Sequence, residues 1–161
     1  MDIYEYAMQL ERDGERYYRE LVEKVANAGL KNILSMLADA EVRHYEIFRR
    51  MRQDDIVEVS DTPILSEVKN IFVEMRERGE SVVSDGSEVD LYERAQEIEL
   101  KTQNFYLEKA REVKDPARKE IFLKVADEER RHYLILENVI DFVARPFSWL
   151  ENAEWYHLEE Y

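Results

Sequence analysis

Two Glu-x-x-His motifs are the residues of this sequence best suited to chemistry. Glu41 precedes His44 by three positions, and Glu129 precedes His132 by the same interval. On a helix, residues three apart lie about 60° apart around the axis, so the carboxylate and the imidazole share one face. Carboxylate oxygen together with neutral imidazole nitrogen suits first-row transition metals. One such motif arises easily by chance in a glutamate-rich chain, so the repetition is the stronger signal.

Two further glutamates stand at matching distances from the two histidines. Glu11 lies 33 positions before His44, and Glu99 lies 33 positions before His132. Each occupies the middle of a stripe at spacing seven that we expect to face the core. The stripes are Tyr4, Glu11, Tyr18 and Tyr92, Glu99, Tyr106. Four buried carboxylates would repel one another and lose hydration, whereas two divalent cations would cancel their charge. The sequence therefore predicts a pair of bound metal ions.

All six candidate ligands belong to an internal repeat. Residues 2–52 align with residues 90–140 without a gap, and 17 of the 51 pairs are identical. The identical pairs include Tyr4/Tyr92, Glu11/Glu99, Tyr18/Tyr106, Glu41/Glu129 and His44/His132. The chain is therefore interpreted as a duplication in which each repeat provides half of the site.

Each repeat has the pattern of a helical hairpin, because apolar residues recur at intervals of three and four. Turns are expected near residues 27–29 and at Asp115–Pro116, where Asp can cap a helix and Pro can begin one. The predicted helices are 2–26, 29–53, 89–113 and 116–144.

The long segment between the repeats, residues 54–88, exceeds what a hairpin needs and holds a predicted short helix from Pro63 to about Arg78. We therefore expect an all-α, ferritin-like four-helix bundle with one long crossover. The first repeat spans 2–53 and the second 89–144, within a single domain of 1–161. A short amphipathic C-terminal helix is predicted in the tail 145–161, and His157 is interpreted as part of that tail.

Composition excludes several classes of protein. The net charge of -14 would repel nucleic acid and disfavours membrane surfaces. No apolar stretch is long enough to span a bilayer, and the first residues are acidic where a signal peptide would be basic, so a cytoplasmic location is expected. The absence of cysteine excludes disulfides, iron–sulfur clusters and thiolate zinc sites.

The chain resembles the di-iron domain of the rubrerythrin and ferritin-like superfamily from Tyr4 to about Ile140. The resemblance is carried by LERDGERYY around Glu11, ADAEVRH around Glu41, IELKTQNFY around Glu99 and ADEERRH around Glu129. It implies two iron ions, with manganese or zinc as substitutes. It also implies that Glu41 and Glu129 bridge the metals, that Glu11 and Glu99 are terminal ligands, and that His44 and His132 each bind one metal.

Two departures from that family bear on the reaction. Rubrerythrins carry an extra carboxylate three residues after the third-helix ligand, and here that position is Thr102. They also carry a cysteine-rich rubredoxin domain that delivers electrons, whereas this chain has no cysteine. Electrons are thus expected from a separate protein, such as a rubredoxin or a reductase.

The leading functional hypothesis is an oxidoreductase that reduces hydrogen peroxide or dioxygen at the metal pair, in a homodimer. Three alternatives stay open. The first is a ferroxidase that handles iron, which for storage requires a closed shell of many subunits. The second is a non-enzymatic bundle held together by metal, and the third is a manganese catalase-like activity.

The remaining polar and aromatic residues near the motifs receive weaker interpretations. Tyr18 and Tyr106 either hydrogen-bond to ligand carboxylates or fill the core. Glu97 and Glu128 lie about 100° or more from the ligand face, so both are expected to be solvated. Packing is the expected role of Tyr4, Tyr45, Tyr92 and Tyr133.

Overall fold

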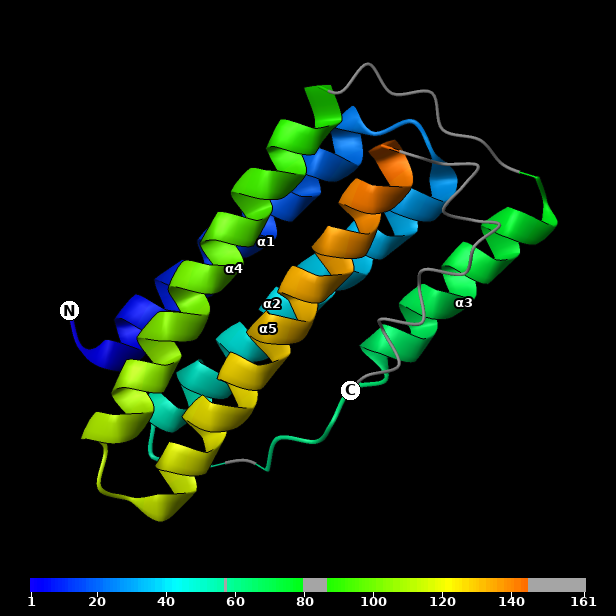
Figure 1. Cartoon of the computed structure of the whole chain (residues 1–161). Helices are drawn as coiled ribbons and strands as arrows, with labels where there is room; N and C mark the ends of the chain where they lie inside the picture. Colours follow the sequence, from blue (N-terminus) through cyan, green and yellow to red (C-terminus); the bar gives the residue numbers. More distant parts are fainter. Residues whose placement is uncertain (57, 80–86, 145–161) are drawn as a thin grey trace.

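The computed structural model, described for residues 1–56, 58–79 and 87–144, contains five helices and no strand in those ranges (Figure 1). The helices are α1 (Ile3–Lys24), α2 (Ala28–Arg52), α3 (Ile64–Glu77), α4 (Ser87–Glu112) and α5 (Pro116–Ala144). The four predicted long helices are confirmed, with every end within two residues of its expected position, and α3 is the predicted short helix. The expected C-terminal helix and His157 lie outside the described residues.

Short polar side chains begin three of the long helices, and the one at Asp115 is the predicted cap. The Asp2 carboxylate accepts a hydrogen bond from the Glu5 amide at 2.8 Å, and the Asn27 side chain accepts one from the Leu30 amide at 2.9 Å. Asp115 accepts from the Ala117 amide at 3.2 Å, and Pro116 opens α5. Each cap pairs an amide that the first turn of a helix leaves without a partner.

The long helices form two hairpins, α1 with α2 and α4 with α5, that pack together as a four-helix bundle (Figure 1). The segment after α2 and helix α3 return along the outside of the bundle, where α3 packs against α2 and α5. This is the predicted long crossover. Gly79, with φ of 66°, follows α3 in the left-handed conformation that a glycine adopts without strain.

The apolar core consists of two clusters with a polar layer between them. Along every long helix the candidate ligands separate one cluster from the other. In α1, for example, Ala7 belongs to one cluster and Tyr18 to the other, and Glu11 lies between them. Apolar side chains therefore shield the polar layer from water at both ends.

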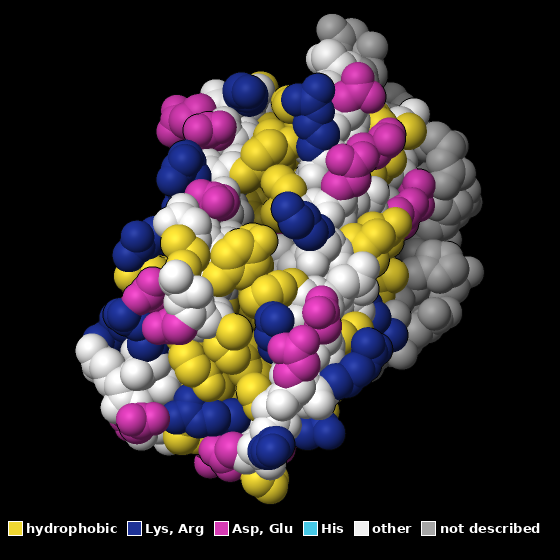
Figure 2. All heavy atoms as spheres, turned by 90° about the vertical axis from the view of Figure 1, so that its left-hand side faces the viewer, with side chains coloured by type: hydrophobic (Ala, Val, Ile, Leu, Met, Phe, Trp, Pro, Cys, Tyr) yellow, Lys and Arg dark blue, Asp and Glu magenta, His cyan; other side chains and the backbone are white. Residues whose placement is uncertain are grey.

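The outer surface of α1 and α4 carries a band of apolar side chains (Figure 2). Tyr6 and Leu100 are exposed there, and the Tyr6 ring packs against Phe105 at a centroid separation of 4.8 Å. None of the described helices combines the length and apolarity needed to cross a membrane.

Candidate metal centre

The four long helices bring all six predicted ligands into one buried cluster. Helices α1 and α4 each contribute one glutamate, and α2 and α5 each contribute one glutamate and one histidine. No member is more than 3% exposed: Glu11, Glu41, His44, Glu99, Glu129 and His132. Positions 88 apart in the sequence thus lie on neighbouring helices, α1 beside α4 and α2 beside α5, and meet in one cluster.

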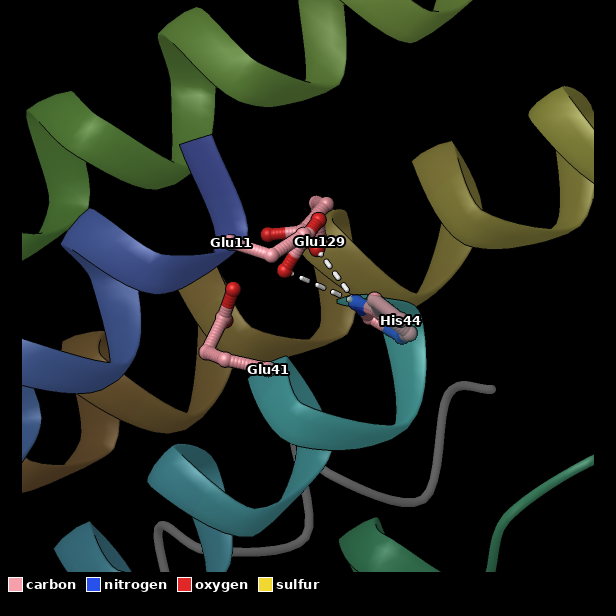
Figure 3. A group of neighbouring side chains, drawn as sticks. All are labelled: Glu11, Glu41, His44 and Glu129. Carbon is pink, nitrogen blue, oxygen red and sulfur yellow. Dashed lines mark ion pairs between the residues drawn. The ribbon is translucent and has the colours of Figure 1, made fainter. Parts of the chain in front are cut away.

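The cluster divides into two overlapping sets that could each hold one metal ion. In each set the candidate ligand atoms lie within 4.8 Å of one another. One set comprises Glu11, Glu41, His44 and Glu129 (Figure 3). The other comprises Glu41, Glu99, Glu129 and His132. Glu41 and Glu129 belong to both sets, which is the arrangement needed for two carboxylates that bridge a pair of metals.

Both histidines direct Nδ1 toward the carboxylates. His44 Nδ1 lies 2.9 Å from Glu129 Oε1 and 3.4 Å from Glu11 Oε2. His132 Nδ1 lies 3.4 Å from Glu99 Oε1 and 3.5 Å from Glu41 Oε1. The two rings stack with centroids 5.9 Å apart and an angle of 14° between their planes.

Each of the six residues carries a buried oxygen or nitrogen atom that makes no hydrogen bond of regular geometry to a described residue, even where two such atoms lie close together, as His44 Nδ1 and Glu129 Oε1 do. These atoms are Glu11 Oε2, Glu41 Oε1, Glu99 Oε2, Glu129 Oε1, His44 Nδ1 and His132 Nδ1. Buried polar atoms are normally paired, so a group of unpaired ones needs an explanation. Two bound cations would coordinate all of them, and mixed carboxylate and imidazole ligands fit a transition metal. The residue set therefore fits a di-metal centre.

The metal-free cluster retains protons that bound cations would replace. Burial, followed by repulsion from neighbouring glutamates, raises the pKa of both Glu41 and Glu129 well above the ordinary value. Burial lowers the pKa of His44, but Glu11, Glu128 and Glu129 outweigh it and raise that pKa well above its usual range. Metal binding must therefore compete with protons at this site.

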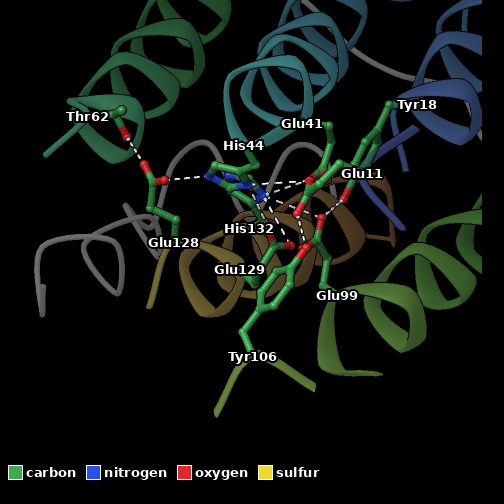
Figure 4. Close-up of polar contacts among 10 residues, drawn as sticks. All are labelled: Glu11, Tyr18, Glu41, His44, Thr62, Glu99, Tyr106, Glu128, Glu129 and His132. Carbon is green, nitrogen blue, oxygen red and sulfur yellow. Dashed lines mark hydrogen bonds and ion pairs between the residues drawn. The ribbon is translucent and has the colours of Figure 1, made fainter. Parts of the chain in front are cut away.

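Tyr18 and Tyr106 donate hydrogen bonds to the two glutamates that each belong to only one set (Figure 4). Tyr18 on α1 donates to Glu99 Oε1, and Tyr106 on α4 donates to Glu11 Oε1 at 2.5 Å. Burial and the adjacent glutamates raise the pKa of both phenols, so both remain protonated donors. Glu11 thus offers one oxygen to Tyr106 and the other to His44, whereas the Glu99 oxygen bound by Tyr18 is also the one that lies near His132 Nδ1.

Glu128 is buried, and the prediction that it is solvated is wrong. Its Oε2 lies 2.5 Å from His44 Nε2, and its Oε1 accepts a hydrogen bond from Thr62 Oγ1 at 2.9 Å (Figure 4). Glu128 does lie off the ligand face of α5, as its angle predicts. The crossover segment that contains Thr62 covers that side of the helix and buries the carboxylate. Burial by itself would raise the pKa of Glu128. The contacts with His44 and Thr62 outweigh burial and lower that pKa to about 2.

Glu97 and the four tyrosines predicted to have packing roles lie outside the two candidate ligand sets. Glu97 is exposed, as expected. Tyr92 is buried, and Tyr4 stacks on Phe122 with centroids 6.2 Å apart. Tyr45 and Tyr133 are half-buried.

Gly14 makes room for one of the two shared glutamates. A Cβ atom at this position would lie 3.0 Å from Glu41 Oε2 and 3.2 Å from Glu41 Cδ. Gly14 lies inside α1, where glycine destabilises a helix by about 1 kcal/mol relative to alanine. A glycine at this position, despite the destabilised helix, agrees with a need for space beside the Glu41 carboxylate.

The variant Gly14→Ala is therefore expected to weaken metal binding by about tenfold without lowering the stability of the metal-free protein. Without metal, Glu41 can move by the few tenths of an ångström required, whereas a Glu41 carboxylate held by metal ions could not move without losing a metal contact. Calorimetric titration with Zn(II) and thermal unfolding would measure the two effects. Unchanged affinity would show that the space is not needed.

A sequence model of the family described as Rubrerythrin matches residues 2–140. That range includes both repeats, the crossover and all six clustered residues. No curated protein and no solved structure gives a significant match to the chain.

Proposed function

Because the chain belongs to the rubrerythrin family, we propose that its six clustered residues bind two iron ions and that this centre reduces hydrogen peroxide or dioxygen. The observation that carries the proposal is the pair of overlapping ligand sets that share Glu41 and Glu129. A single-metal site would leave several of the buried ligand atoms unpaired.

In this proposal each residue has one role toward the metals. Glu41 and Glu129 bridge both ions, Glu11 and His44 complete one position, and Glu99 and His132 complete the other. Bound iron would supply the electrons, one from each ion for each two-electron reduction. Manganese and zinc suit the same ligands and are proposed as substitutes.

The protein itself positions the ligands and excludes water. The apolar clusters above and below the polar layer keep the carboxylates in a medium of low polarity, which strengthens their attraction to cations. Tyr18 and Tyr106 hold the two terminal glutamates in place by hydrogen bonds. A donor protein such as a rubredoxin or a reductase is proposed to supply electrons to the centre.

The reaction should be determined by loading the metal-free protein with iron(II) without oxygen and mixing it rapidly with peroxide or with dioxygen. Thr102, buried in α4 where rubrerythrins carry an extra carboxylate, makes this comparison necessary. We expect stoichiometric oxidation of both irons. A large preference for peroxide would assign a peroxidase, and a preference for dioxygen would assign an oxidase or ferroxidase. Slow oxidation by both, at the rate of free iron(II), would reject both enzymatic proposals.

Iron handling is the second candidate, since the same residues suit oxidation of iron(II) for storage. We propose a homodimer instead of a closed shell, and the apolar band on α1 and α4 supports contact between copies of the chain (Figure 2). Solution mass separates the two candidates, because a dimer cannot enclose a mineral. A particle of many subunits would favour storage.

A further inference from the structure

The two-fold relation between the repeats breaks down beside the histidines. His44 Nε2 meets a buried carboxylate oxygen of Glu128 at 2.5 Å. The position equivalent to Glu128 in the first repeat is Ala40, whose methyl group has no hydrogen-bonding atom. In agreement with this, His132 Nε2 is buried and has no hydrogen-bond partner in the part of the chain that the structure describes.

Glu128 is itself held in position from its other side. Thr62, in the crossover before α3, donates a hydrogen bond to Glu128 Oε1, so both carboxylate oxygens have partners (Figure 4). Among the described residues of the crossover, none makes a corresponding hydrogen bond on the side of His132, whose Nε2 has no partner. The asymmetry therefore follows from the topology as well as from the Ala40 and Glu128 difference.

A carboxylate that accepts the Nε2 proton of a histidine has two effects on the metal bound at Nδ1. It fixes the tautomer that leaves the Nδ1 lone pair free, and it makes that nitrogen a stronger donor. The negative charge of Glu128 also attracts the cation directly. His132 receives neither effect from a described residue, and its buried Nε2 proton lacks an acceptor.

We propose that the two metal positions are inequivalent and that Glu128 makes the position at His44 the tighter one, which fills first. This inference rests on the proposed di-metal centre. Glu128 acts through His44 and is a positioning residue. The position at His132 then exchanges its metal more readily.

The test is a calorimetric titration of the full metal-free chain with Zn(II), together with NMR of the protein labelled with ¹⁵N at histidine. We expect two binding steps that differ by at least about tenfold in affinity, the size typical of a ligand's hydrogen-bonding partner. At one equivalent of Zn(II), the His44 resonances should shift before those of His132. Assignment uses single His→Gln variants.

The variant Glu128→Gln should weaken the first step by about tenfold or more and the second step much less, because Glu128 contacts His44 and reaches His132 only through its charge. The amide oxygen can still accept from His44 Nε2, and the amide NH2 can donate to the Thr62 hydroxyl, which also accepts, so both contacts can persist while the charge is lost. Glu120→Gln, which removes an exposed charge from the same helix, should change neither step.

Each of three outcomes would overturn one part of the proposal. Equal steps, or His132 shifting first, would overturn the inequivalence while the metal centre stands. An unchanged first step in Glu128→Gln would overturn the role of Glu128. Absence of Zn(II) binding would instead overturn the proposed centre. If Glu128→Gln does not fold, the order in which the unmodified protein fills its two metal positions still decides whether the positions are inequivalent.

Discussion

The variant Glu129→Gln is expected to lose metal binding while its metal-free form stays at least as stable as the parent protein. Glu129 belongs to both candidate ligand sets, so its loss affects both positions. We expect affinity to fall by more than about 100-fold, beyond the upper end of the effect of removing a ligand's hydrogen-bonding partner. The measurements are metal content after anaerobic loading and thermal unfolding of the metal-free protein.

The metal-free Glu129→Gln variant is expected to keep its stability because glutamine resembles a protonated glutamate. Burial and the nearby Glu99 and Glu11 raise the pKa of Glu129, so ionisation of this residue destabilises the metal-free fold. An uncharged amide removes that repulsion. The control is Glu120→Gln, which should alter neither property. A variant that keeps two tightly bound metals, or one that unfolds more easily without metal, would contradict the assigned role.

Metal loading is expected to raise the melting temperature, by an amount that grows as the pH rises. Free metal at 100 times the dissociation constant of the tighter position adds about 2.7 kcal/mol of stability from that position alone. For a chain of this size about 1 kcal/mol shifts the melting temperature by about 2–4 °C, so a rise of roughly 5–11 °C is expected. Thermal scans of metal-free and Zn(II)-loaded protein between about pH 5.5 and pH 8 would measure it.

The direction of the pH effect follows from the raised pKa values of Glu41, Glu129 and His44. Groups with a raised pKa in the fold stabilise it below their unfolded values, about 4.3 for Glu and 6.5 for His, and lose that contribution as the pH rises. Bound metal replaces those protons, so only the metal-free protein loses stability. Glu128, whose pKa is lowered to about 2, contributes nothing to the change in this range.

A metal-induced rise in melting temperature that stayed constant, or became smaller, between pH 5.5 and pH 8 would contradict this account. It would mean that metal does not replace protons in the buried cluster. Chelation followed by reloading is the matched control, because it shows that the difference between the two scans is reversible.

The helices and the six clustered residues could be predicted from sequence because both depend on local spacing. Apolar residues at intervals of three and four define helical faces, and Asp115 followed by Pro116 marks where α5 begins. The repeat then paired Glu11 with Glu99 and each motif with its copy. Duplication requires the two halves to pack alike, so equivalent residues meet at the bundle axis.

The partners of His44 could not be predicted in this way. Glu128 and Thr62 are 66 positions apart and meet only because the crossover covers one side of the bundle. Helical periodicity says which way a side chain points, but not what covers that side. The available signal was the departure from the repeat, Ala40 in one copy against Glu128 in the other. A charged residue that breaks an internal symmetry beside a ligand deserves consideration as that ligand's partner.

We propose that each chain holds two metals between Glu41 and Glu129. Anomalous diffraction at the iron edge, from crystals of protein loaded with iron(II) without oxygen, would locate them. We expect two peaks about 3.5–4 Å apart, the spacing typical of two-metal sites, with one beside His44 Nδ1 and the other beside His132 Nδ1. A single peak, or peaks away from the six clustered residues, would contradict the account.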